Sequence, residues 1–185
     1  MTSKQLSLQN FMGHLPQMDG SVWWHPSAQI IGQVSLGCNS SIWCGAVIRG
    51  DVNSISIGDR TNIQDNSVLH VSHPTPSHPD GAALFIGNDV TVGHSCILHG
   101  CHIADASLIG MGCIVMDNAR IESEVLLGAG SLVPERQTLQ SGYLYLGRPA
   151  KRIRPLTDEE IAYLYYSAQH YMRLAAQYHD DANRV

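Results

Sequence analysis

The chain of 185 residues is long enough for one compact domain with an appendage, and its hydrophobic content of 44% allows a buried core. A net charge of −5 without a basic cluster argues against nucleic acid as a partner. No run approaches the roughly 20 apolar residues of a membrane helix, and the first residues lack the apolar stretch of a signal peptide, so we expect a cytoplasmic protein with no membrane partner.

Residues 1–20 show no clear period and predict an arm that packs on the first coil of a repeating region. From Ile30 onward, aliphatic residues recur mostly at six-residue steps. They are Ile30, Leu36, Ile42, Ile48, Ile57, Ile63, Leu69, Ile86, Val92, Leu98, Ile103, Ile109, Val115, Ile121, Leu127 and Val133. A period of six fits neither a helix nor simple strand alternation, but it is typical of hexapeptide repeats, in which short strands are separated by turns. We therefore predict an all-β fold, a parallel β-helix over residues 21–141, with the aliphatic side chains inside.

Three hexapeptides make one triangular coil of about 18 residues. Aliphatic residues one coil apart should therefore stack on the same face. Two insertions interrupt the register: a short one follows Asp51, and a longer one runs from Ser72 to Leu84. The longer insertion carries three of the eight prolines and predicts a projecting loop.

The sixfold repeat is expected to end after Val133, and residues 142–185 are predicted to form a connecting segment and a C-terminal α-helix. Thr157 is the expected N-cap, with Glu160 three residues later in the capping-box pattern. The apolar residues that come next at helical spacing are Ile161, Leu164, Ala168, Met172 and Ala175. One amphipathic helix over about 157–180 should bury this stripe against a β-helix, its own or a neighbour's.

Three histidines carry the main functional signal. His70 and His99 each follow an aliphatic residue on the same face of successive coils, so they should stack at the strand spacing of about 4.8 Å. His94 lies two residues after Val92, on the preceding face, and points from another edge, so the three cannot meet within one chain. In a threefold ring, His94 of one subunit could meet His70 and His99 of its neighbour. Three neutral histidines leave a fourth position open, as in a catalytic zinc site.

The coil that precedes the histidines carries further polar residues at matching positions. Arg49 occupies the position of His70 one coil earlier, with Asp51 two residues on, and Asp65 occupies the position of His94 with Gln64 beside it. An arginine–aspartate pair across a subunit seam can be purely structural. A glutamine or aspartate there can instead hold a metal-bound water or orient a ligand histidine, and the sequence leaves both interpretations open.

Several motifs together resemble the gamma-class carbonic anhydrase family, most of all its bacterial YrdA-type members. They are IRGD (48–51), NIQD (62–65), His70, VGH (92–94), LHGC (98–101), GYLYLG (142–147) and RPLTDEE (154–160). The resemblance runs from about Trp23 to the end of the helix. It implies a left-handed β-helix that forms a homotrimer, with zinc, or iron or cobalt, at the subunit interfaces.

By matching motifs, the resemblance implies that His70, His94 and His99 are the metal ligands, with His94 supplied by the adjacent chain. Arg49 and Asp51 match the family's intersubunit ion pair. Three further residues become candidate catalytic residues by the same resemblance. Asn62 and Gln64 match residues near the metal-bound water and CO2, and Tyr171 matches the helix tyrosine near the metal.

The function implied by the resemblance is that of a lyase in which zinc-bound hydroxide hydrates CO2 to bicarbonate. The chain departs from the best-studied members where they carry proton-shuttling glutamates, because Val52 follows Asp51 and the 72–84 loop has Asp80 as its one acidic residue. His73 is a candidate replacement. The alternatives are a hexapeptide acyltransferase or thioesterase acting on acyl-CoA, and a catalytically weak metal-binding scaffold. Histidines on two edges favour metal chemistry, because acyl transfer does not require them.

Overall fold

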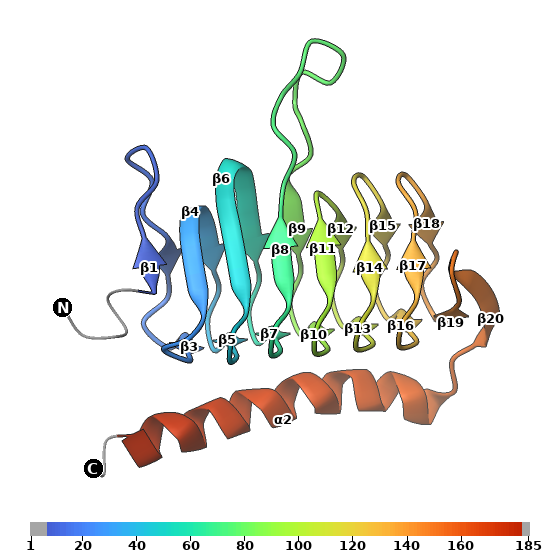
Figure 1. Ribbon diagram of the computed structural model, residues 1–185. Coiled ribbons are helices and arrows are strands. Elements are labelled where there is room, and N and C mark those ends of the chain that lie inside the picture. Colours follow the sequence, from blue (N-terminus) through green and yellow to red (C-terminus); the bar gives the residue numbers. More distant parts are fainter. Residues whose placement is uncertain (1–6, 183–185) are drawn as a thin grey trace.

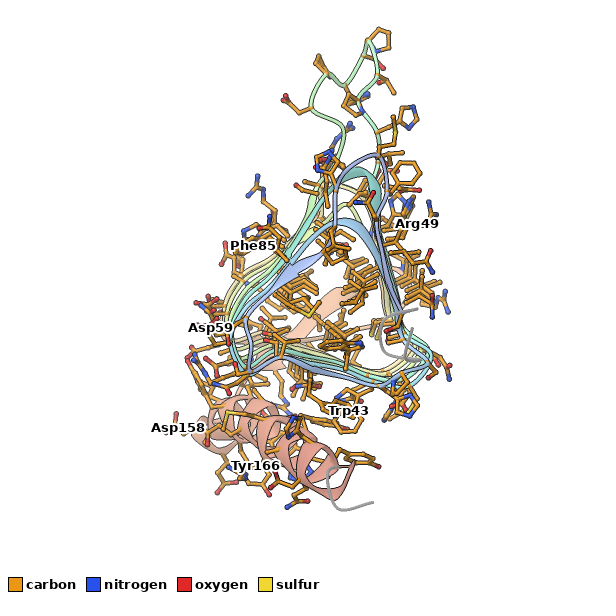
Figure 2. All side chains as sticks on the ribbon, turned by 90° about the vertical axis from the view of Figure 1, so that its left-hand side faces the viewer. Trp43, Arg49, Asp59, Phe85, Asp158 and Tyr166 are labelled. Carbon is orange, nitrogen blue, oxygen red and sulfur yellow. The ribbon has the colours of Figure 1, made fainter. Side chains whose placement is uncertain are left out.

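The structure, a computed structural model, describes residues 7–182 and is a parallel β-helix with one α-helix along its side (Figure 1). Residues 1–6 of the expected N-terminal arm, and residues 183–185, lie outside the described part of the chain. Viewed along its axis, the β-helix is a triangular prism with side chains packed inside it (Figure 2). The fold class predicted from the sixfold period is confirmed.

Three faces of stacked strands form the prism, and we name two of them for what they carry. The histidine face consists of β1 (Leu8–Gln9), the first halves of β4 (Gln29–Leu36) and β6 (Val47–Ile57), β8 (Val68–His70), β11 (Ile97–His99), β14 (Ile114–Val115) and β17 (Leu132–Val133). The helix face consists of β3 (Trp23–Trp24), β5 (Ser41–Ile42), β7 (Asn62–Ile63), β10 (Thr91–Val92), β13 (Leu108–Ile109), β16 (Leu126–Leu127), β19 (Tyr143–Leu146) and β20 (Lys151–Pro155). The third face consists of β2 (Gln17–Met18), the second halves of β4 and β6, β9 (Leu84–Ile86), β12 (His102–Ile103), β15 (Arg120–Ile121) and β18 (Thr138–Leu139).

The aliphatic residues of the repeat fill the prism, as the periodicity predicted. Ile48, Leu69 and Leu98 stack in register on the histidine face, and none of the three side chains has exposed surface. Burying such a side chain contributes roughly 1.5–3 kcal/mol. Small polar residues beside them are satisfied between coils, since the Ser67 hydroxyl donates to the Gly93 carbonyl at 3.0 Å. Stacking therefore fixes which residues lie at each corner.

The expected end of the repeat at Val133 is wrong. Leu139 and Tyr145 continue the six-residue steps as buried residues, in β18 and β19. β18 pairs with β15 and β19 with β16, both in parallel, so residues 143–146 extend the prism rather than merely connecting it to the helix. Leu139 fits the aliphatic pattern and was overlooked, whereas Tyr145 escaped the pattern because it is aromatic. The Tyr145 hydroxyl finds a partner by accepting the Gln140 N–H at 2.8 Å.

Both predicted insertions lie at the corner between the histidine face and the third face. β4 and β6 run through this corner as single long strands, with a register shift between Gly32 and Val34. A Cβ on Gly32, whose φ is +79°, would lie 2.4 Å from the Gly50 carbonyl oxygen, so glycine is required where these paired strands pass through the corner. The longer insertion projects from the prism between β8 and β9 (Figure 1). It ends one residue earlier than expected, because Leu84 is buried as the first residue of β9.

The C-terminal helix, α2 (Asp158–Ala182), runs along the helix face of its own chain and contacts β3, β5, β7 and β10 (Figure 1). The predicted capping box is present: the Glu160 N–H donates to Thr157 Oγ1 at 3.2 Å, and the Thr157 N–H donates to Glu160 Oε2 at 2.9 Å. Leu164, Ala168 and Ala175 of the predicted stripe are buried. No helix in residues 7–182 is long and apolar enough to cross a membrane.

Candidate metal centre

His70 and His99 lie side by side at the end of the histidine face. β8 and β11 are adjacent parallel strands that pair these two residues in register, which confirms the stacking predicted from the sequence. His70 Nδ1 lies 3.0 Å from His99 Nε2, and the ring centroids are 5.0 Å apart. The two imidazoles therefore present one nitrogen each to a common point.

Each of these rings holds a carboxylate on its other nitrogen. His70 Nε2 donates to Asp51 Oδ1 at 3.1 Å, and His99 Nδ1 donates to Asp117 Oδ1 at 2.5 Å. Because a carboxylate accepts the hydrogen bond, these outer nitrogens carry the protons of the neutral rings. The facing nitrogens are then both unprotonated, and their lone pairs point at each other. Such a pair needs a cation, either an additional proton or a metal ion.

The surroundings of His70, above all its burial, oppose the additional proton. Burial lowers the pKa of His70; the hydrogen bond with Asp51 works against this, and the Arg49 charge adds to the lowering. Arg49 and Asp51 form an ion pair within one chain. Burial alone would raise the pKa of Asp51, but the hydrogen bonds from Arg49 and His70 and the Arg49 charge outweigh it, so the pKa is lowered and the carboxylate stays charged.

His94 lies at the other corner of the histidine face, in the turn that follows β10. Its Nδ1 donates to Asp65 Oδ2 at 2.9 Å, and 47% of its side chain is exposed. Asp65 lies one coil earlier in the same column, as the sequence register predicted. His94 therefore repeats the pattern of His70 and His99, with a carboxylate on one nitrogen and the other nitrogen free to bind.

The candidate residues Asn62, Gln64 and Tyr171 lie on the helix face beside this corner. Asn62 Nδ2 donates to Thr91 Oγ1 at 3.0 Å, and Gln64 Nε2 donates to Asn62 Oδ1 at 3.1 Å. Thr91 Oγ1 in turn lies 3.0 Å from Ser167 Oγ on α2. Asn62 and Gln64 are both buried, so this network fixes the orientation of their amides.

Tyr171 extends from α2 to the same region. Its ring lies 5.5 Å from that of Trp43, in an edge-on arrangement. Burial raises the pKa of Tyr171, and the nearby Asp65 charge raises it further. The phenol is therefore a neutral hydrogen-bonding group at ordinary pH.

The three histidines do not converge within the chain. His94 lies where the histidine face begins, whereas His70 and His99 lie where it ends. Among residues 7–182, no three histidine, cysteine, aspartate or glutamate side chains of one chain are placed to hold a metal ion together. This separation agrees with the expectation that a single chain cannot complete the site.

Sequence reasoning missed two residues of the histidine cluster, Asp117 and Ser72. Asp117 lies in the coil after His99, and its second carboxylate oxygen accepts the Ser72 hydroxyl at 2.6 Å. A signal was present, because Asp117 follows Val115, the residue stacked on Leu98, by two positions. Asp117 lies one position beyond the column of the paired histidines, where Met116 follows Val115, so it is found only when the neighbouring position in the coil after them is also considered.

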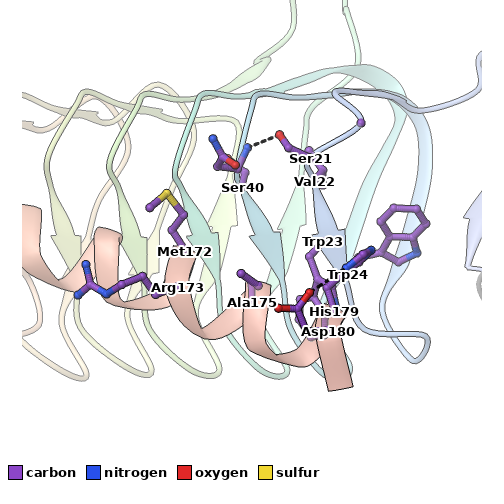
Figure 3. Close-up of a pocket in the computed structure, with 13 residues that line it drawn as sticks. Ser21, Val22, Trp23, Trp24, Ser40, Met172, Arg173, Ala175, His179 and Asp180 are labelled. Carbon is purple, nitrogen blue, oxygen red and sulfur yellow. Dashed lines mark hydrogen bonds and ion pairs between the residues drawn. The ribbon is translucent and has the colours of Figure 1, made fainter. Parts of the chain in front are cut away.

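A separate hollow of about 540 Å³ lies between the C-terminal half of α2 and the first coils (Figure 3). Its lining includes Trp23, Trp24, Met172 and Arg173. None of the site residues expected from the sequence lines it. The hollow is therefore distinct from the histidine cluster and from the His94 corner.

The chain was compared with known proteins, and no protein-family model matches it. The protein YrdA of Escherichia coli (strain K12) is 50% identical over 178 residues, which cover 96% of this chain and 97% of that protein. Gamma carbonic anhydrase 2, mitochondrial, of Arabidopsis thaliana is 45% identical over 183 residues, 98% of this chain, which spans 64% of the plant protein's length.

Two further similarities cover most of both proteins. A carbonic anhydrase of Geobacillus kaustophilus (strain HTA426) is 42% identical over 151 residues, which cover 82% of this chain and 79% of that protein. Among solved structures, a hexapeptide transferase family protein from Anaplasma phagocytophilum is 44% identical with a TM-score of 0.88, covering 94% of this chain and 99% of the other.

Proposed function

The chain belongs to the gamma carbonic anhydrase family, and from that premise we propose that it is a zinc-dependent carbonic anhydrase that converts CO2 to bicarbonate as a homotrimer. Zinc would be held by His70 and His99 of one subunit and by His94 of the next. The family membership supports the reaction class, and the donor groups of this chain support the metal.

One observation carries the metal assignment: the facing, unprotonated nitrogens of His70 and His99 at 3.0 Å. A carboxylate on the far nitrogen of a histidine fixes its tautomer and raises its basicity, the usual support of a metal ligand. All three proposed ligands have this support, from Asp51, Asp117 and Asp65. The donor set therefore fits a borderline divalent metal such as zinc, with iron or cobalt as alternatives.

When bound, zinc acts as a Lewis acid that makes water a nucleophile near neutral pH. The residues of this chain would then orient the reactants. Gln64 is held by Asn62, which is held by Thr91, so its amide is fixed at the corner that carries His94. We assign Gln64 and Asn62 to the orientation of water and CO2, and Tyr171 to a neutral hydrogen bond at the rim. Arg49 keeps Asp51 charged and so supports His70.

A row of outward apolar side chains supports the homotrimer. On the histidine face, one residue of each successive coil lies in register on the outside: Val47, Val68, Ile97, Ile114 and Leu132. The side chains of Val68 and Ile97 remain 40% and 44% exposed in the single chain. This apolar row lies between the His94 corner and the His70–His99 corner, where a neighbouring subunit would have to pack. A contiguous exposed apolar surface is typical of an interaction site.

Acyl transfer or thioester hydrolysis with acyl-CoA is the second candidate function. It is favoured by the solved structure from Anaplasma phagocytophilum, which is described as a hexapeptide transferase family protein. The facing pair of histidines, each with a carboxylate partner, favours metal chemistry over acyl transfer, because acyl transfer needs only a single histidine as a base. A metal-binding scaffold without turnover is the third possibility, and it shares the metal site with the first.

The proposal is tested by assaying CO2 hydration on zinc-loaded and iron-loaded protein, beside a panel of acyl-CoA substrates. We expect hydration that is lost in His94→Ala and kept in His78→Ala, a histidine of the projecting loop. Light scattering should give about three times the chain mass of 20.2 kDa. Acyl-CoA turnover without hydration would favour the second candidate, and a monomer with full zinc occupancy would contradict the shared site.

A further inference from the structure

The projecting loop, residues 72–83, is tied to the proposed metal ligand His99 through two side chains. We infer that Ser72 and Asp117 are positioning residues, through which the loop sets how tightly His99 binds metal. The inference rests on the proposed metal site. It goes beyond that site because it assigns the loop a role in metal affinity.

The link is a continuous chain of hydrogen bonds. Ser72 Oγ donates to Asp117 Oδ2 at 2.6 Å, and His99 Nδ1 donates to Asp117 Oδ1 at 2.5 Å. Asp117 thus uses one oxygen for the loop and the other for the ligand. Without the Ser72 hydroxyl, the carboxylate would lose the contact that fixes its rotation, and the His99 ring would lose a rigid support.

The backbone around Gly100 is shaped to admit this carboxylate. Gly100 follows His99 directly and has a φ of +49°. A Cβ at Gly100 would lie 2.6 Å from Asp117 Oδ1 and 2.6 Å from the Cβ of Ala82, at the far end of the loop. Because Gly100 has no side chain, Ala82 at the end of the loop and the Asp117 carboxylate can both lie against the residue that follows His99.

The base of the loop is itself anchored to the prism. Ser72 and Ala82 exchange two backbone hydrogen bonds of 3.0 Å. Asn53 Nδ2 donates to the carbonyl oxygens of Ser72, at 3.1 Å, and Asp80, at 2.9 Å. Ser72 and Asp117 both line a hollow of about 240 Å³ beneath the loop. The position of Ser72 is thus set by contacts at the base of the loop, so a change there can be passed to Asp117.

The proposed ligands His70 and His99 differ in what holds their carboxylate partners in place. Asp51, which supports His70, is held by Arg49, and both of these residues lie on β6 of the prism. Asp117, which supports His99, is held by Ser72 of the loop. Loss of the Ser72 hydroxyl should therefore act on His99 more than on His70, which separates this coupling from a general loosening of the site.

The test measures zinc affinity by competition with a chromophoric chelator in the full-length protein. Removal of a supporting partner of a ligand histidine typically weakens metal binding about 10- to 100-fold, so we expect Asp117→Asn to fall in that range. Ser72→Ala should weaken binding several-fold, and Ser72→Thr, which keeps the hydroxyl, should restore it. Ser77→Ala makes the same chemical change further along the loop and should leave the affinity unchanged.

A second readout needs no metal. The 15N chemical shifts of His99 in metal-free protein report which ring nitrogen carries the proton, and Ser72→Ala should shift them more than those of His70, whose partner Asp51 is held by Arg49. If Ser72→Ala and Ser77→Ala give the same zinc affinity and the same His99 shifts, the inferred coupling between the loop and His99 is wrong even though zinc binds. If wild-type protein binds no zinc, the proposed function fails, and the His99 shifts still decide whether Ser72 positions the ring.

Discussion

His70 Nδ1 faces His99 Nε2 across 3.0 Å, while Asp51 and Asp117 take the hydrogen bonds of the two outer nitrogens. In this arrangement two neutral imidazoles cannot satisfy each other, because neither facing nitrogen carries a proton. Burial lowers the pKa of His70 and so disfavours a shared extra proton. The pair therefore supports the metal site that we propose, and substitution of each ring tests it.

His70→Ala and His99→Ala should each abolish tight zinc binding. Two ligands remain in either case, fewer than the three protein ligands that catalytic zinc sites use. Metal analysis after dialysis should fall from about one zinc per subunit in wild type to a small fraction of that. His78→Ala is the matched control, because His78 is a loop histidine whose Nε2 accepts from Arg136 at 3.1 Å. Equal zinc content in all four proteins would show that the facing pair is not the site.

Thr157→Ala should destabilise the protein by about 1 kcal/mol, the usual cost of removing an N-cap hydroxyl. The Glu160 N–H would lose its partner at 3.2 Å. Chemical denaturation measures the change, and Thr157→Ser, which keeps the oxygen, is the control. Zinc content should not change, since the cap lies several helical turns away from Tyr171. Loss of zinc would mean that α2 builds the metal site.

The hydrogen bonds of Glu160 at this cap also predict how the stability of the fold depends on pH. The Arg154 guanidinium and the Thr157 N–H lower the pKa of Glu160 from 4.5 to about 2. Because the folded pKa is depressed, this carboxylate stabilises the fold above about pH 4.5, and the stabilisation is lost as the pH falls toward 2. Glu160→Gln should therefore show a shallower loss of stability over that interval. Glu159→Gln changes an exposed carboxylate in the same turn and should follow wild type; a Glu160→Gln curve parallel to wild type would contradict the assignment.

Most of the fold was accessible from the sequence because the period of six also sets the register. Once Leu69 and Leu98 are assigned to the same face, the pairing of His70 with His99 follows. Tyr145 was missed because it is an aromatic residue in an aliphatic position. Its hydroxyl accepts the Gln140 N–H, a contact that the six-residue period cannot predict.

The turns and the carboxylate partners were harder to predict. Glycine, asparagine and aspartate are the residues that most readily adopt a left-handed backbone, yet Ser95 and Arg136 also have φ values of +59° and +60°. Stacking imposes this conformation: the Ser95 N–H must reach the Asp65 carbonyl at 2.8 Å. The contact between Ser72 and Asp117 spans 45 residues and depends on how the loop folds back, so no local spacing could reveal it.

Proton export should limit the proposed reaction. The residue that follows Asp51 is Val52, 41% exposed, and its side chain cannot carry a proton. Imidazole buffers should therefore raise the turnover number at saturating CO2, while exchange between CO2 and bicarbonate at equilibrium stays unchanged. Turnover independent of buffer concentration would indicate an internal shuttle, and His73→Ala, at the base of the loop, would then test the nearest candidate.

The assignment of His94 to a neighbouring subunit can be tested by mixing two inactive variants. His94→Ala leaves His70 and His99 intact, and His70→Ala leaves His94 intact, so neither protein alone can form a complete site. After subunit exchange, an interface that takes His94 from one variant and the facing pair from the other is complete again. Other interfaces in the same mixed trimer combine both substitutions and keep His99 alone.

Zinc binding should therefore reappear in the mixture although neither parent retains the metal. Random exchange makes the complete interface a minority, so recovery should be partial, about one quarter of wild type at equal mixing. Exchange is followed separately by mass spectrometry of isotopically labelled chains. A mixture of His70→Ala with His99→Ala is the control, because both substitutions damage the same corner and no interface can combine an intact facing pair. No recovery in the His94 mixture after proven exchange would show that His94 is not the ligand from the neighbouring subunit, and recovery in the control would show that one chain does not supply both His70 and His99.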